Sequence, residues 1–162
     1  MKLTMTALSL ASLAFALPAF AEAVSGDAEA GAKVFAKCQT CHVVTDPSGA
    51  VLAGKNAKTG PNLYGMPGRV AGTYPDFGGY GESLIAVGAT GFTWNEADFV
   101  AYVKDPAKFL KAKLDDKKAK TMMTYKLPKE KDALDVYAFI SSLSPAADAA
   151  EAPAAEAAPA TN

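Results

Sequence analysis

The pentapeptide Cys38-Gln39-Thr40-Cys41-His42 contains both cysteines and the one histidine of this 162-residue chain. With no further cysteine, the chain cannot build a framework of several disulfides. With no second histidine, it cannot hold a zinc centre that uses several histidine ligands. A formal net charge of −1 excludes a uniformly basic nucleic-acid binder, and a hydrophobic content of 50% excludes a wholly disordered chain. The pentapeptide is therefore the main candidate for a functional site.

Its C-x-x-C-H spacing predicts covalent attachment of haem c. Cys38 and Cys41 are three positions apart, so on a helical turn both thiols point to the same side. They can then add to the two vinyl groups along one edge of a porphyrin, while His42 reaches the iron from one face. A thioredoxin-like redox pair would need a strand–helix frame that the sequence does not predict. A zinc site would crowd three ligands into one turn without a second Cys/His pair.

Both ends of the chain are predicted to lie outside the folded domain. Residues 1–21 combine a positive start, an apolar run of eleven residues and an Ala-Phe-Ala cleavage site, which is typical of a cleaved signal peptide. A retained anchor is the alternative, but a membrane span needs about 20 residues. Residues 146–162 are mostly alanine, proline and acidic residues, which predicts a flexible tail. Residues 22–145 then form one domain in the periplasm, where free thiols tend to oxidise unless they are occupied.

This domain is predicted to be all-α. Apolar spacing, capping residues and helix stops predict five short helices, over residues 27–38, 82–87, 93–104, 105–110 and 130–143. The third begins with a capping-box pattern, Thr93-Trp94-Asn95-Glu96. No convincing alternation predicts a strand. Residues 43–79 contain eight glycines and four prolines and no helical pattern. So long a structureless segment is uncommon inside a compact domain unless it wraps around a large apolar group.

Residue content alone leaves the second axial ligand of the iron open. Without a second histidine, the position could be taken by Met, Lys, Tyr or water, or stay vacant. Three methionines lie within the domain. Met66 could be ordinary packing in the Gly/Pro-rich segment, whereas Met122 and Met123 lie in a predicted loop between helices. A loop methionine can place its thioether over an open haem face, although most methionines simply fill gaps in a core.

Across residues 26–143 the chain resembles the class I cytochromes c, in the long form that bacteria use as a periplasmic electron shuttle. The resemblance is carried by Gly31, Phe35, the pentapeptide, Thr59-Gly60-Pro61-Asn62-Leu63-Tyr64-Gly65, Gly68-Arg69, Tyr80, Trp94, Tyr102, Thr121-Met122-Met123, Val136 and Phe139. It implies the class I cytochrome c fold, with long loops wrapped around one covalently bound haem. At the position of Met122, the family often has lysine.

The resemblance also implies roles for individual residues. Met123 would be the second iron ligand opposite His42, and the Pro61 carbonyl would accept the ring N–H of His42, which raises ligand basicity. Tyr102 would hydrogen-bond near the methionine sulfur. The residues implied to satisfy the haem propionates are Arg69, Tyr80, Trp94 and Thr121; for Tyr80, Trp94 and Tyr102, plain core packing is the alternative. Gly31 and Phe35 would meet the last helix at Val136 and Phe139.

These ligands predict an electron carrier and not an enzyme, because an iron with His and Met ligands has no open coordination position. A peroxidase or gas-binding haem, which needs a vacant sixth position, is the competing function. Residues 104–131 contain ten lysines and four acidic residues. This positive segment is predicted to steer the protein toward acidic surfaces of membrane redox complexes, a cytochrome bc complex and a terminal oxidase or photosynthetic reaction centre, or of periplasmic dehydrogenases. We expect a monomer that touches membrane complexes transiently and binds no nucleic acid.

Overall fold

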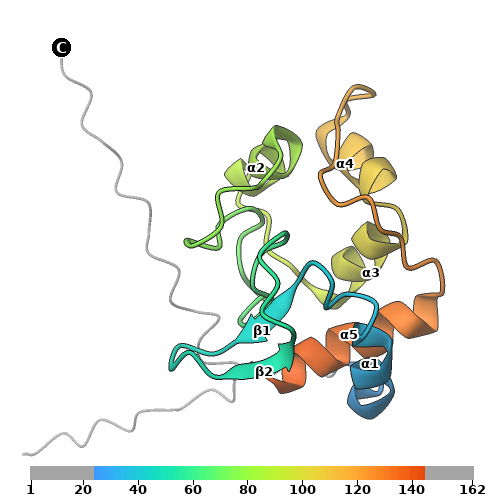
Figure 1. Ribbon diagram of the computed structural model, residues 1–162. Coiled ribbons are helices and arrows are strands. Elements are labelled where there is room, and N and C mark those ends of the chain that lie inside the picture. Colours follow the sequence, from blue (N-terminus) through green and yellow to red (C-terminus); the bar gives the residue numbers. More distant parts are fainter. Residues whose placement is uncertain (1–23, 145–162) are drawn as a thin grey trace, which may run out of the picture.

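The computed structural model describes residues 24–144, so the predicted signal peptide (1–21) and tail (146–162) lie outside the described residues (Figure 1). Five helices and one small sheet make up this part of the chain. In order they are α1 (Ala28–Phe35), β1 (Val43–Thr45), β2 (Val51–Gly54), α2 (Glu82–Ala89), α3 (Glu96–Lys104), α4 (Pro106–Leu114) and α5 (Glu130–Ser142). The mostly helical fold predicted from the sequence is confirmed. No helix among residues 24–144 is long and apolar enough to cross a membrane.

Side-chain caps explain where several helices begin. Asp27 caps α1, and Asp105 caps α4 with Pro106 in the first turn, as their positions in the sequence predict. The prediction that Thr93 opens α3 was wrong. The backbone of Thr93 instead pairs with Val70 in an isolated β-bridge. The cap is the next polar residue, Asn95, whose side chain accepts a hydrogen bond from the third amide of the helix.

The expectation of no strand was also wrong for residues 43–54. Here β1 and β2 form an antiparallel hairpin with Val43 opposite Gly54. The carboxylate of Asp46 closes its turn by accepting hydrogen bonds from the amides of Ser48 and Ala50, both at 2.9 Å. Strands of three and four residues, with a register shift after Val44, are too short to show a two-residue period in the sequence.

Helices α1 and α5 cross in direct contact and form one end of the domain (Figure 1). Gly31 allows this approach, since a Cβ at this position would collide with the backbone carbonyl of Asp135. One turn later the rings of Phe35 and Phe139 pack with centroids 5.4 Å apart. This is the predicted contact of the first helix with the last, and it fixes the position of the chain that follows α1.

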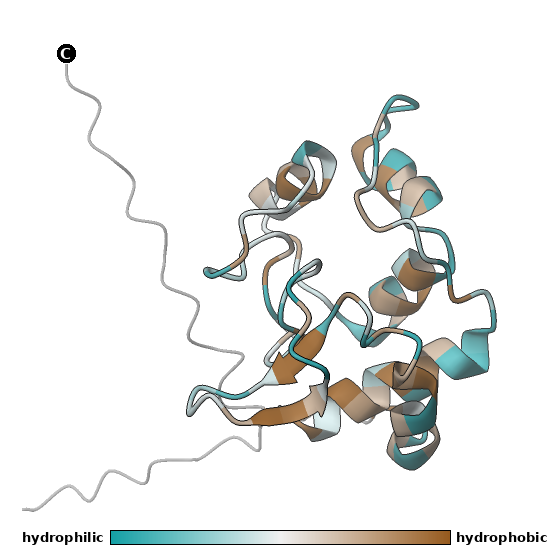
Figure 2. Ribbon diagram, in the orientation of Figure 1, coloured by the Kyte–Doolittle hydropathy of each residue, from teal (hydrophilic) through white to brown (hydrophobic). Residues whose placement is uncertain are grey.

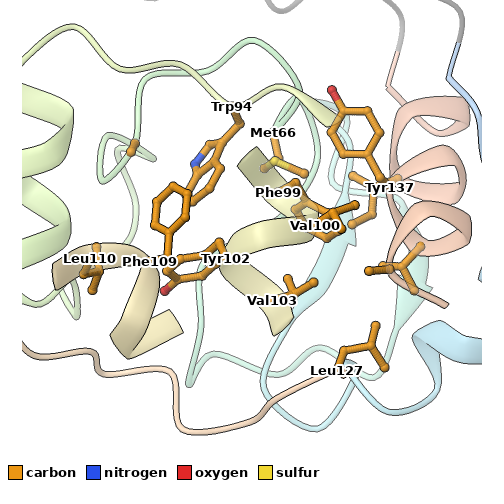
Figure 3. Packing of buried hydrophobic residues seen from close by; sticks show 14 of the residues in the cluster. Met66, Trp94, Phe99, Val100, Tyr102, Val103, Phe109, Leu110, Leu127 and Tyr137 are labelled. Carbon is orange, nitrogen blue, oxygen red and sulfur yellow. The ribbon is translucent and has the colours of Figure 1, made fainter. Parts of the chain in front are cut away.

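Most of the other buried apolar residues come from β1, α3, α4 and the loops between them, whereas Val51 and Leu52 of β2 are exposed. In Figure 2 the hydrophobic colour is concentrated on β1, β2 and the middle of α5. Figure 3 shows the aromatic part of the core, where the rings of Trp94, Tyr102 and Phe109 lie together with centroids 5.1–6.0 Å apart. Residues 55–81 carry no helix and run as a loop along this core. The packed core thus lies next to a long segment without helices, residues 55–81.

Candidate haem site

A cavity of about 260 Å³ lies between this loop, the pentapeptide, α3 and the segment that follows α4. Its apolar lining includes Leu63, Val70 and Leu84. The predicted site residues all line this one cavity: Cys38, Cys41, His42, Pro61, Arg69, Tyr80, Trp94, Tyr102, Thr121 and Met123. The fold therefore brings together groups from both ends of the domain. Met66 and Met122 line the cavity as well.

The pentapeptide continues the spiral of α1 as a series of turns. The amide of Cys38 donates to the carbonyl of Phe35 at 2.8 Å, and the amide of His42 donates to the carbonyl of Cys38 at 2.9 Å. This winding holds Cys38, Cys41 and His42 on the cavity wall. No disulfide joins Cys38 to Cys41, and burial raises the pKa of the Cys38 thiol to about 11, so the thiol would be neutral before haem is attached.

The imidazole of His42 is fixed from two sides. Its Nδ1 lies 2.9 Å from the carbonyl oxygen of Pro61, which can only accept, so Nδ1 carries the proton. Burial lowers the pKa of His42, which keeps the ring neutral. A Cβ on Gly60 would lie only 2.7 Å from Nδ1, so the glycine backbone packs directly on the ring. The Nε2 lone pair is left available for a metal ion.

Thr121 organises the segment that carries the two adjacent methionines. Its hydroxyl is 3.1 Å from both the amide nitrogen and the carbonyl oxygen of Met123, and it hydrogen-bonds with the phenol of Tyr102. The side chain of Met123 packs against the core, whereas Met122 is 72% exposed. Met66 is 3% exposed and belongs to the core cluster in Figure 3.

Polar donors line the cavity beside the 62–80 loop. The guanidinium of Arg69 donates to the carbonyls of Tyr64 and Asn62, at 2.9 and 3.0 Å, and has no carboxylate partner within residues 24–144. Burial lowers the pKa of Arg69 and raises that of Tyr80. The indole N–H of Trp94 makes no hydrogen bond within the same residues. A part-buried cation and an indole N–H without a hydrogen-bond partner beside a cavity suit a ligand with anionic groups.

These residues fit a haem c. They provide two thiols for thioether bonds, an imidazole with a free Nε2, a thioether and an apolar wall. They also provide donors for two carboxylates.

Known proteins with similar sequences and structures also indicate a haem c. The chain is 62% identical over 131 residues to cytochrome c2 of Fuscovulum blasticum, covering 81% of this chain and 82% of that one. It is 54% identical over 143 residues to cytochrome c2 of Cereibacter sphaeroides, covering 88% and 97%. The crystal structure of cytochrome c2 from Rhodobacter sphaeroides matches with a TM-score of 0.72 at 58% identity, covering 73% of this chain and 96% of that one. The chain belongs to the cytochrome c2 family of class I cytochromes c. No protein-family model matches it.

As a class I cytochrome c, the chain carries one covalent haem c and serves in electron transport. It is an electron carrier and not an enzyme, as predicted.

Asn62 is a residue of this cytochrome whose role the sequence did not predict. Its side chain accepts hydrogen bonds from the amides of Thr45 and Tyr64 at 2.9 and 3.0 Å, and donates to the carbonyl of Thr45 and the phenol of Tyr74 at 2.7 and 3.1 Å. It thereby joins β1 to the loop that carries Pro61. The one signal in the sequence was its place inside the Gly60-Pro61-Asn62-Leu63 run of the resemblance.

Proposed function

We propose that this cytochrome is a soluble periplasmic one-electron carrier whose iron is held between His42 and Met123, with Cys38 and Cys41 as the thioether attachments. The observation that carries the proposal is that an imidazole with a free Nε2 and a part-buried thioether line one cavity from opposite ends of the domain sequence. A haem with these ligands supplies one-electron exchange between Fe(III) and Fe(II), and the thioether favours Fe(II).

The surrounding residues support this role by keeping the two proposed iron ligands in fixed positions. Pro61 and Gly60 fix the plane of the His42 ring, and Thr121 fixes the backbone of Met123. Apolar side chains, among them Leu63, Val70 and Leu84, line the space between them. Because both ligand-bearing segments are tied to the core, the same pair of ligands serves both oxidation states and little has to move. The side chains of Arg69, Tyr80, Trp94 and Thr121, which line the cavity, would satisfy the propionates.

The partners proposed for this carrier are proteins with acidic surfaces. Of the ten lysines between residues 104 and 131, four form ion pairs within the described residues, namely Lys104, Lys113, Lys126 and Lys131. The others keep their charge free for a partner. Lys120 is exposed and lines the mouth of the cavity. This charge would steer a monomer into transient contact with a cytochrome bc complex, a terminal oxidase, a photosynthetic reaction centre or a periplasmic dehydrogenase.

A matched pair of variants tests the axial ligands. Met123→Ala should lose the visible spectrum of six-coordinate, low-spin Fe(II) and bind carbon monoxide at neutral pH, because the sixth position becomes vacant. Met122→Ala should keep the spectrum and resist carbon monoxide. The opposite pattern would make Met122 the ligand. A wild-type protein that binds carbon monoxide readily would favour a gas-binding or peroxidase haem instead.

Mass spectrometry of the exported protein should place its first residue near Glu22.

A further inference from the structure

The three methionines at the cavity differ sharply in exposure. Met66 is 3% exposed, Met123 is part-buried against the core, and Met122 is 72% exposed, the highest value among the exposed large hydrophobic residues of the described chain. Methionine oxidation follows access to the sulfur. An oxidant arriving from solvent therefore meets three thioethers with very different accessibility within one site.

The backbone of the loop enforces this difference. Thr121 hydrogen-bonds to both the amide and the carbonyl of Met123, which directs that side chain toward the core. Met122, the residue between them, faces outward and lies across Gly81 at the start of α2. A Cβ on Gly81 would sit 2.9 Å from Cγ and 3.8 Å from the sulfur of Met122.

Met122 also lies at a seam in the cavity rim, the place where the 120–123 segment meets the start of α2. Next to it, the amide of Lys120 donates to the hydroxyl of Ser83 on α2 at 3.0 Å. The 120–123 segment and the start of α2 thus meet through one hydrogen bond and the Met122–Gly81 contact. Met122 presents its apolar side chain to solvent at this seam, beside the exposed Lys120.

We propose that Met122 is a reversible oxidation site that changes the polarity of the cavity rim and leaves the iron ligands untouched. The reaction needs a hydroperoxide, for which hydrogen peroxide is the simplest case. The Met122 sulfur forms an S–O bond with the terminal oxygen while the peroxide O–O bond breaks. Sulfur loses two electrons, the peroxide gains them, and water leaves. Methionine sulfoxide reductases reverse the change.

The product places a polar S=O group where the native surface has an apolar thioether. This change lies beside the lysine surface proposed above for docking, so its consequence for partners rests on that proposed function. The oxidation itself rests only on exposure and on the loop geometry. The two can therefore be tested separately.

The test treats the ferric holoprotein with substoichiometric hydrogen peroxide, removes unreacted peroxide with catalase and maps the added oxygen by peptide mass spectrometry. Met122 should carry about tenfold more oxygen than Met66 or Met123, in line with their accessibility. The low-spin spectrum should be unchanged, retention on a hydrophobic-interaction column should decrease, and methionine sulfoxide reductases A and B together should restore it. Met122→Leu should lose most of the oxygen uptake, whereas Met66→Leu should take up as much as the wild type.

Oxygen found mainly on Met123 or Met66 would overturn the proposal, as would a Met122 that resists oxidation. In the second case Met122→Leu shows which proposal failed. If that variant lacks the low-spin spectrum, Met122 is the iron ligand and the assignment of Met123 is wrong too. If its spectrum is normal, only the oxidation site is lost and the axial ligands stand.

Discussion

The ring nitrogen Nδ1 of His42 lies 2.9 Å from the carbonyl oxygen of Pro61. Gly60, the residue directly before Pro61, donates its own amide to the carbonyl of Cys41 at 2.7 Å. The loop is therefore anchored to the pentapeptide by its backbone as well as by the ring. Any side chain on Gly60 would have to enter the space that the imidazole occupies. The glycine and the proline thus set the position of His42 together.

Gly60→Ala should displace the His42 ring. The added Cβ would lie 2.7 Å from Nδ1 and 2.9 Å from Nε2, closer than real contacts allow. We expect the free energy of unfolding to fall by roughly 1–3 kcal/mol, as for other overpacked sites. The reduction potential should also shift, because the Pro61 hydrogen bond is strained. Chemical denaturation and potentiometric titration of the purified holoprotein measure both effects.

Gly78→Ala is the matched control for this change. It lies in the same stretch of irregular chain, but a Cβ at Gly78 meets nothing within 4 Å. Its unfolding free energy should stay within about 0.5 kcal/mol of the wild type. If both alanine variants behave alike, close packing on the imidazole is not what requires glycine at position 60.

Asn62→Ala should loosen the loop that carries Pro61. It leaves the amide and carbonyl of Thr45 and the amide of Tyr64 without their side-chain partner. Losing these bonds should cost roughly 1–3 kcal/mol of stability. A weaker Pro61 bond also makes the His42 ring less basic, which disfavours Fe(III), so the reduction potential should rise.

Asn62→Asp separates the two halves of this network. The carboxylate can still accept from the amides of Thr45 and Tyr64, but it cannot donate to the Thr45 carbonyl or the Tyr74 phenol. We expect a potential between those of the wild type and Asn62→Ala. An alanine variant with reduced stability and an unchanged potential would mean that Asn62 supports the fold without positioning His42.

Local sequence patterns predicted most of the helices and the main groups of the site. Asp27 and Asp105-Pro106 are local signals that predict where a helix begins. The C-x-x-C-H motif is likewise local, since five consecutive residues predict haem attachment. The sequence did not predict the hairpin because its strands are too short to carry a recognisable two-residue period, and they are stabilised by pairing with each other. The cap of α3 was misplaced because the bridge from Thr93 to Val70 is a contact between segments distant in sequence.

The same limit explains what the sequence could not give at the site. Asn62 matters through bonds to Thr45 and Tyr74, which only the folded chain brings together. Met122 and Met123 are indistinguishable by composition. Their opposite exposures follow from how Thr121 holds one backbone amide and carbonyl. Residue types are local information, whereas the direction of a side chain is set by the packed loop.

Electron transfer to an acidic redox partner should slow as ionic strength rises, because salt screens the lysine surface. Lys120→Gln should lower the association rate at low salt and weaken its salt dependence, since Lys120 is exposed at the cavity mouth. Lys33→Gln is the control, because Lys33 lies on α1 and pairs with Glu29 at 3.8 Å. Stopped-flow kinetics over a salt series compares them. Equal effects of the two substitutions, or rates independent of salt, would remove the lysines from docking.

Asp135 should make the cytochrome less stable in acid. This carboxylate is 4% exposed and accepts hydrogen bonds from Lys131 Nζ at 2.7 Å and from the amide of Asp27 at 2.9 Å. The Lys131 bond, and then the Asp27 amide, lower the pKa of Asp135 below its ordinary value of 3.8. Its contribution to folding is therefore complete above about pH 4 and is lost as the pH falls through the lower, folded-state pKa.

Asp135→Asn should thus reduce stability at neutral pH, by roughly 1–3 kcal/mol for a charged hydrogen bond, and reduce the loss on acidification. Thermal unfolding of the holoprotein between pH 7 and about pH 2 measures the difference between the two curves, which should shrink as Asp135 is protonated in the wild type. Glu29→Gln removes an exposed ion pair on the same helix pair and should change little at any pH. Parallel curves for Asp135→Asn and the wild type down to the lowest pH would mean that the charge of Asp135 does not stabilise the contact of α1 with α5.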